Sequence, residues 1–65
     1  MVMVKTFTSE LKPFYTKKEL DSLDAEVNAF LRDNRVPRVT SVSDTCTTEG
    51  GATIGIIRVV TYEPA

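Results

Sequence analysis

The feature that most constrains this chain is one apolar stretch, residues 53–63, within a sequence of only 65 residues. The stretch is rich in β-branched residues and carries no helical stripe, so it predicts a β-strand. Because side chains alternate across a strand, Ile56 and Val60 fall on one face, and Ile57 and Val59 fall on the other. Both faces are apolar, as in a central strand with material on each side. A chain this short can cover only one of them, so the sequence predicts self-association.

The length predicts one domain over residues 1–65. A domain of this size buries only about 60% of its unfolded surface, so disulfides, a metal or oligomerisation usually add stability. Cys46 is the only cysteine and the chain has no histidine, which leaves no intrachain disulfide and a poor set of zinc ligands. Oligomerisation remains, and we expect a homo-oligomer without a metal or other cofactor.

The charge and hydropathy of the chain exclude several classes of protein. Eight basic and nine acidic residues give a net charge of -1, so we expect no sequence-specific nucleic-acid binding. No apolar run approaches the roughly 20 residues of a membrane span, and the N-terminus lacks the features of a secretory signal. A single unpaired cysteine fits a reducing compartment. We expect a cytoplasmic protein that does not bind membranes.

A helix is predicted to begin at Thr16. Thr16 followed by Glu19 matches a capping box, and Asn34 is suited to a left-handed helix end with Pro37 shortly after it. The apolar residues of this segment recur at helical spacing and form one stripe, which comprises Leu20, Leu23, Val27, Phe30 and Leu31.

Two further strands are predicted on either side of this helix. Residues 2–8 alternate as a first strand, and residues 38–48 combine β-branched and polar residues as an edge strand does. Val39 and Val42 have opposite parity, which predicts a bulge or bend near Ser41. The paired glycines before residues 53–63 provide the positive φ angles of a tight hairpin.

These elements predict an α+β fold with the order β-α-β-β. The most apolar strand belongs in the middle, so the spatial order of the three antiparallel strands is expected to be 1-3-2. The helix covers one face of the sheet, and the open face is expected to mediate oligomerisation.

This pattern looks like the strand-helix-strand-strand modules of dodecins and related small oligomers. More narrowly, the chain resembles a family of short, uncharacterised sporulation-associated proteins of spore-forming bacteria and their phages. The resemblance covers most of the chain and rests on VKTF at 4–7, LDAEVNAFL at 23–31 and IRVVTY at 57–62. It implies the fold and transfers no site residue. Some small phage proteins that sequester immune nucleotide signals are also compact oligomers, which is an analogy of size.

The sequence does not predict an enzyme. It has no histidine, no Gly-rich phosphate loop and no nucleophile elbow. The carboxylates Asp21 and Asp24 lie on the polar side of the predicted helix, where solvated charge is the ordinary interpretation. Cys46 has no base to generate its thiolate. We therefore assign no catalytic residue.

Lysines cluster where the predicted helix begins, although the helix macrodipole disfavours cations there. A bound anion would satisfy both the lysines and the free backbone donors of the first turn. The adjacent aromatic residues could stack on a base or close a pocket. The alternative is that the lysines are solvated and the aromatic side chains pack on the core as a hydrophobic staple. The candidate ligand-binding residues here are Lys12, Phe14, Tyr15, Thr16, Lys17 and Lys18.

Arg58 interrupts the apolar face of the predicted central strand. A charge in that position cannot be buried alone. Arg58 is therefore expected to pair with a carboxylate of another subunit or to contact a ligand held between subunits. Arg32, Arg35 and Arg38 form another basic group, which either stabilises the helix C-terminus or grips a phosphate.

Together these features predict a non-enzymatic, oligomeric binding protein. It would hold or sequester a small anionic ligand, such as a cyclic nucleotide signal, at a subunit interface. The alternative is a structural or regulatory module, sporulation- or phage-associated, whose open face docks a protein partner without a small ligand. A co-purifying ligand that absorbs ultraviolet light would separate these two, because the chain has no tryptophan.

Overall fold

The structure is a computed structural model that describes residues 1–65 and contains one helix and three strands. Along the chain these are β1, α1, β2 and β3, which confirms the predicted order. The element bounds are β1 Met3–Glu10, α1 Thr16–Asp33, β2 Arg38–Glu49 and β3 Ala52–Glu63.

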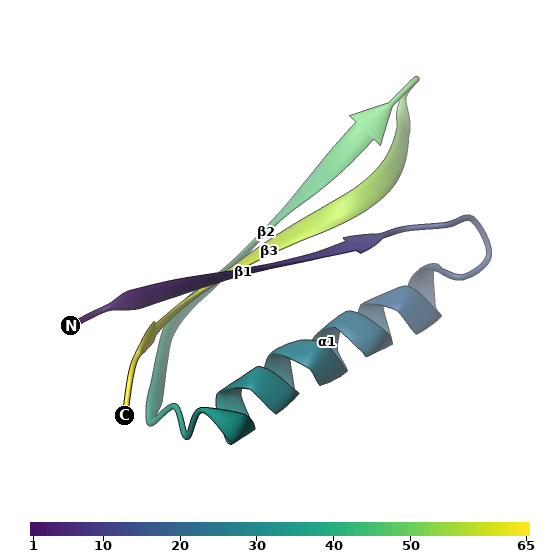
Figure 1. Cartoon of the computed structure of the whole chain (residues 1–65). Coiled ribbons are helices and arrows are strands. Elements are labelled where there is room, and N and C mark those ends of the chain that lie inside the picture. Colours follow the sequence, from purple (N-terminus) through teal and green to yellow (C-terminus); the bar gives the residue numbers. More distant parts are fainter.

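The three strands form one sheet in the order β1-β3-β2, with β3 antiparallel to both neighbours. The predicted topology is therefore confirmed. Helix α1 lies on one side of the twisted sheet, and no element covers the other side (Figure 1). No helix in the chain is long and apolar enough to cross a membrane.

The core lies between α1 and the sheet and is small. Five hydrophobic side chains are buried, and they come from β1, α1 and β3. Phe30 packs edge-on against Phe7 and Tyr62, with ring centroids 5.7 and 5.4 Å apart. The predicted helical stripe thus packs on the face of β3 that carries Ile56 and Val60. The buried side chains are Phe7, Leu23, Val27, Ile56 and Val60.

The β2–β3 hairpin and the irregularity in β2 also follow the prediction. Gly50 and Gly51 have φ angles of +59° and +83°, as the tight turn requires. The register of β2 against β3 shifts between Val39 and Ser41, next to the predicted position, and this shift brings both Val39 and Val42 to the helix side.

The start of α1 differs from the prediction, because no capping box forms. Tyr15 occupies the N-cap position, and no side chain caps the helix. The Thr16 hydroxyl donates to the Lys12 carbonyl at 3.4 Å, while the Glu19 carboxylate accepts from the Lys12 amide at 2.8 Å. The turn at Pro13 brings the backbone of Lys12 back to the start of α1. The Thr16 and Glu19 side chains therefore form hydrogen bonds with the Lys12 carbonyl and amide instead of capping the helix.

The end of α1 differs by one residue. Asn34 has a φ of -96°, and Arg35 instead adopts the left-handed conformation, with a φ of +50°. The amide of Arg35 donates to Arg32 and that of Val36 donates to Leu31, at 3.1 and 3.0 Å. This is the hydrogen-bond pattern of a Schellman motif. The Phe30 carbonyl accepts both the backbone amide of Asn34, at 3.1 Å, and its side-chain amide, at 2.9 Å.

The sheet face turned away from α1 is called the open face below. The strand register places apolar side chains along its centre, on β3, and hydroxyl side chains along β1 and β2. Its central part carries no charged residue. The open face comprises Val4, Thr6 and Thr8 of β1, Gly55, Ile57, Val59 and Thr61 of β3, and Ser41, Ser43, Thr45 and Thr47 of β2.

Candidate functional site

A tight turn holds an aromatic side chain out in solvent just before α1. The amide of Tyr15 donates to the Lys12 carbonyl at 3.1 Å, and Phe14 between them has a φ of +70°. With Pro13 before it, Phe14 occupies the turn position that favours glycine. The Phe14 side chain is nevertheless fully exposed. The staple interpretation is therefore wrong for Phe14, because its ring contacts no core residue.

A shallow pocket of about 320 Å³ lies beside this turn. It brings together three of the predicted residues, Lys12, Tyr15 and Lys18, and we call it the lysine pocket. Sequence reasoning missed the other lining residues. Ser22 lies one helical turn after Lys18 and could have been found by spacing, whereas Ser9 reaches the pocket only through the packing of β1. The complete lining is Ser9, Lys12, Tyr15, Lys18, Glu19 and Ser22.

The charges of the lysine pocket are unevenly neutralised. Lys18 forms no ion pair within the chain, and the ammonium of Lys12 lies 3.8 Å from the Glu10 carboxylate. Glu19 places one negative charge in the pocket, but its carboxylate already accepts the Lys12 amide. The first amides of α1 have no side-chain cap. Lys18 and these amides form an electropositive helix start that is suited to a small anion.

Three of the residues predicted at the helix start do not line the lysine pocket: Phe14, Thr16 and Lys17. The ammonium of Lys17 pairs with the carboxylate of Asp21, one turn further along α1, at 3.2 Å. The Thr16 hydroxyl is bonded to the backbone of Lys12. Phe14 precedes the pocket residue Tyr15 in the sequence, and its exposed ring is free to contact the outer side of a bound ligand.

Arg58 lies on the helix side of β3 and is paired within the chain. Its guanidinium donates to both carboxylate oxygens of Asp44 on β2, at 2.8 and 3.0 Å, and to Asp24 on α1. The expectation of a carboxylate from another subunit is therefore wrong, because strand register and helix packing provide two from the same chain. Only 15% of the Arg58 side chain is exposed, and it ties together α1, β2 and β3.

These contacts shift two pKa values in the direction expected of an ion pair. Hydrogen bonds from Arg58 lower the pKa of Asp44, with a smaller opposing effect of desolvation. Hydrogen bonds to Asp44, and then to Asp24, raise the pKa of Arg58 above its usual value. The pairing keeps Arg58 charged and satisfies that charge locally, so little of it is left to attract a ligand.

Arg58 also lines a different hollow from the lysine pocket. This second hollow, of about 270 Å³, lies between α1 and β2, and we call it the α1–β2 hollow. The predicted ligand-binding residues therefore line two separate hollows, with Lys12, Tyr15 and Lys18 in one and Arg58 in the other. The α1–β2 hollow is lined by Asp24, Val27, Asn28, Leu31, Val39, Val42, Arg58 and Val60.

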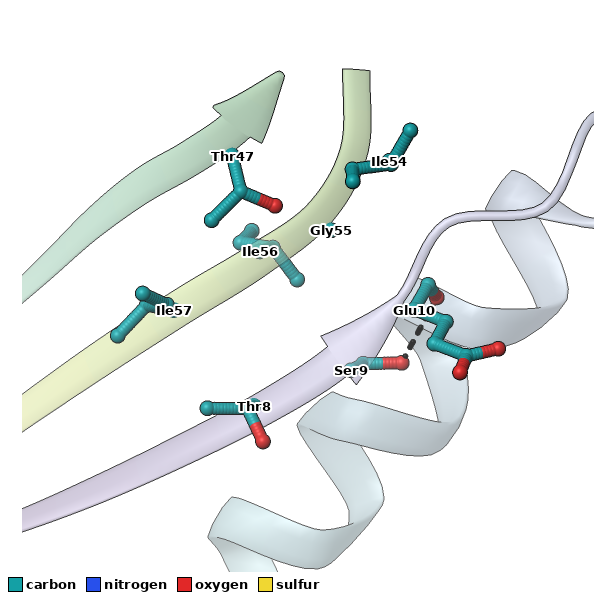
Figure 2. A pocket seen from close by; sticks show the side chains of 8 residues that line it. All are labelled: Thr8, Ser9, Glu10, Thr47, Ile54, Gly55, Ile56 and Ile57. Atoms are coloured by element: carbon teal, nitrogen blue, oxygen red, sulfur yellow. Dashed lines mark hydrogen bonds between the residues drawn. The ribbon is translucent and has the colours of Figure 1, made fainter. Parts of the chain in front are cut away.

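A third hollow, of about 500 Å³, surrounds Gly55 near the tip of the β2–β3 hairpin (Figure 2). A Cβ on Gly55 would lie 2.8 Å from the Thr47 hydroxyl oxygen and 3.3 Å from the Ser9 carbonyl oxygen. A side chain at position 55 would therefore displace the Thr47 hydroxyl and crowd the Ser9 carbonyl, so glycine fits this close approach best. Glu10 is the only charged residue of the lining, so the hollow has no cationic side chain that would attract an anion. No predicted site residue lies here.

The structure contains no group of His, Cys, Asp and Glu side chains placed to hold a metal ion. Comparisons with known proteins find no matching family model, no matching curated protein and no matching solved structure. The resemblance to sporulation-associated proteins therefore stays a prediction, while the β-α-β-β architecture that it implied is present.

Proposed function

We propose that this protein is a non-enzymatic, oligomeric binding protein that holds or sequesters a small anionic ligand of the nucleotide class. The ligand would occupy the lysine pocket. The observation that carries this proposal is the uncapped start of α1 with the unpaired Lys18 beside it, next to the exposed ring of Phe14.

The phosphate of such a ligand matches the helix start. Free amides at a helix N-terminus, together with a lysine ammonium, are a common arrangement for binding phosphate. The hydroxyls of Ser9 and Ser22 line the same pocket and can donate further hydrogen bonds. Glu19 opposes a highly charged anion, so a ligand with one or two phosphate charges fits better than a triphosphate.

The base of a nucleotide matches the aromatic residues. Phe14 is fully exposed despite a backbone conformation that favours glycine, and such local strain is commonly found at binding sites. Tyr15 is also exposed and lines the pocket. A base stacked on an aromatic ring gains about 1–3 kcal/mol, whatever its identity.

Two features support an oligomer. The lysine pocket is shallow, whereas sites for small molecules bury most of the ligand surface, so a neighbouring subunit would provide the missing wall. The open face also leaves the apolar centre of β3, Ile57 and Val59, only half-buried in a chain with a small core. In this proposal Arg58 stabilises the fold, and the ligand contacts come from the helix start.

Isothermal titration with a panel of mononucleotides and cyclic nucleotides tests this function. Lys18→Ala should weaken binding of the nucleotide found by about tenfold or more, because a charged hydrogen bond contributes about 1.5–3 kcal/mol. Lys17→Ala is the matched control, since the Lys17 ammonium pairs with Asp21, and should leave binding unchanged. Absence of binding by the whole panel, or equal loss in both variants, would refute the proposal.

The α1–β2 hollow favours a second candidate function, a protein-docking module without a small ligand. Val39 and Val42 on β2 are exposed there, beside Leu31 of α1, and form an apolar surface that the chain itself does not cover. Under this alternative Lys18→Ala changes nothing, and the purified protein carries no ligand that absorbs ultraviolet light.

A further inference from the structure

We propose that the outer edge of β2 pairs with β2 of a second copy, in antiparallel orientation about a two-fold axis. The two sheets then join into one sheet of six strands. This edge is separate from the open face and from the lysine pocket, so the inference goes beyond the proposed function.

The edge of β2 is accessible along its whole length. Every residue of β2, Arg38–Glu49, is exposed. Helix α1 packs beside β1 at the opposite edge of the sheet (Figure 1). There the Lys5 ammonium lies 5.9 Å from the ring of Phe7 and 5.7 Å from that of Phe30, which closes the space between β1 and α1. No part of the chain obstructs a strand that approaches β2.

The ladder geometry identifies the backbone groups that this edge presents. The amide of Leu11 donates to the carbonyl of Ile54, one position beyond the last paired residues of β1 and β3, Glu10 and Gly55. Because hydrogen-bonded pairs alternate in an antiparallel ladder, the even-numbered residues of β3 bond to β1 and the odd-numbered ones bond to β2. Ser43 and Thr45 of β2 therefore bond inward, opposite Val59 and Ile57. The unpaired outward groups belong to Val42, Asp44 and Cys46.

This edge lacks the features that normally prevent strands from pairing. Natural edges carry lysines, prolines, bulges or inward-pointing charges. Residues 41–47 contain no lysine, proline or bulge. Their single charge, Asp44, points to the helix side and is already neutralised by Arg58. This run of seven residues is therefore unprotected, and the register shifts of β2 lie at its two ends, between Val39 and Ser41 and between Thr47 and Thr48.

Self-complementarity favours a second copy as the occupant. A two-fold axis at Val42 places that residue opposite Val42 of the second copy and Ser41 opposite Ser43. The regular ladder then comprises residues 41–43 of both chains, and each Asp44 lies next to the bulge at Thr40 of the other chain, so the carboxylates stay apart. The exposed Val39 and Val42 side chains of both copies join the two α1–β2 hollows into one apolar surface. A net charge of -1 per chain adds little repulsion.

Replacing Val42 by proline removes an outward amide that the β3 ladder does not use. Val42→Pro should halve the number of subunits measured by native mass spectrometry, with an unchanged far-ultraviolet circular dichroism spectrum. Val42→Thr keeps the amide and is the matched control, and it should assemble as the unmodified chain does. A folded Val42→Pro protein with the original number of subunits would overturn the inference.

A cross-linking experiment avoids dependence on proline. In a Cys46→Ser background, Val42→Cys should form a disulfide-linked dimer under mild oxidation, because directly opposed residues of a hydrogen-bonded pair have Cα atoms about 5.5 Å apart. The unmodified chain should not cross-link, since the two Cys46 residues lie four residues from the axis on opposite sides, much farther apart than the Cα atoms of a disulfide. Failure of Val42→Cys to cross-link, or efficient cross-linking through Cys46, would overturn this pairing. Neither result would bear on nucleotide binding in the lysine pocket.

Discussion

At the scale of single residues, two non-glycine residues adopt the left-handed backbone conformation, and they have different roles. Arg35 ends α1 with the hydrogen bonds of a Schellman motif, so its conformation has a structural cause. Phe14 occupies a tight turn and exposes its whole side chain. A left-handed conformation at such a residue costs about 1–2 kcal/mol. In our proposal ligand binding offsets that cost at Phe14.

The two left-handed residues form a matched pair of variants. Phe14→Gly and Arg35→Gly should each raise the free energy of unfolding, measured in urea, by about 1 kcal/mol, because glycine adopts this conformation without strain. Only Phe14→Gly should weaken nucleotide binding in a calorimetric titration. If both variants bound the nucleotide as tightly as the unmodified protein, Phe14 would have no part in the site.

Asp44 makes the stability of the fold depend on acidity. Because the folded-state pKa of Asp44 is lowered, its contribution is fully present above the unfolded value of about 3.9 and is lost as the pH falls through the folded value. Asp44→Asn should lower the free energy of unfolding at pH 7 by about 1 kcal/mol. It should also reduce the loss of stability below about pH 4.

Urea titrations at several pH values measure both effects. Asp33→Asn provides the control, since the carboxylate of Asp33 is exposed and lies 3.4 Å from Arg32 at the end of the helix. An exposed pair of this kind contributes about 0–1 kcal/mol. A parallel pH dependence for Asp44→Asn and the unmodified chain would show that the Arg58 pair does not stabilise the fold.

At the scale of secondary-structure elements, the patterns that repeat along the chain predicted the fold. The helical stripe from Leu20 to Leu31, the two-sided strand and the paired glycines are all local signals, and each element appears where expected to within two residues, β1 extending to Glu10. The helix ends were less predictable. Which residue satisfies a free backbone group depends on the neighbouring turn, and Lys12 rather than Thr16 interacts with Glu19.

The open face belongs to this scale, because a whole strand face is involved. Ile57 lies at its centre, on β3. Ile57→Lys places a charge there, which a buried interface would not tolerate. We expect this variant to fold and to contain fewer subunits than the unmodified protein in sedimentation velocity. Thr61→Lys, nearer the end of the face, should have a smaller effect. An unchanged sedimentation coefficient for Ile57→Lys would exclude the open face as an interface.

At the scale of the whole molecule, the chain is a thin slab with Cα extents of 41 × 19 × 11 Å. One helix and one sheet form two layers, and the sheet has no third layer beyond it (Figure 1). Only five hydrophobic side chains are buried between the layers. A domain with so small a core usually needs additional stabilisation. In our proposals, the open face and the free edge of β2 are the two surfaces through which other subunits supply this stabilisation.

The candidate site was only partly predictable, because some of its contacts depend on sequence neighbours and others depend on how the whole chain folds. Lys12, Tyr15 and Lys18 are close in sequence, so one turn and one helix start suffice to bring them together. The surroundings of Arg58 depend on the β2–β3 register and on the packing of α1, which bring Asp44 and Asp24 to it. The residue types alone do not specify the β2–β3 register or the packing of α1, so the intrachain pairing of Arg58 could not be predicted.

The central claim, that this chain functions as an oligomer with a bound anion, is tested most directly by native mass spectrometry of the unmodified protein purified without denaturation. We expect a complex of more than one chain that carries additional mass in whole multiples per subunit. Collision-induced release should then identify a nucleotide as the source of that mass. A spectrum of single chains without added mass would contradict both the assembly and the ligand.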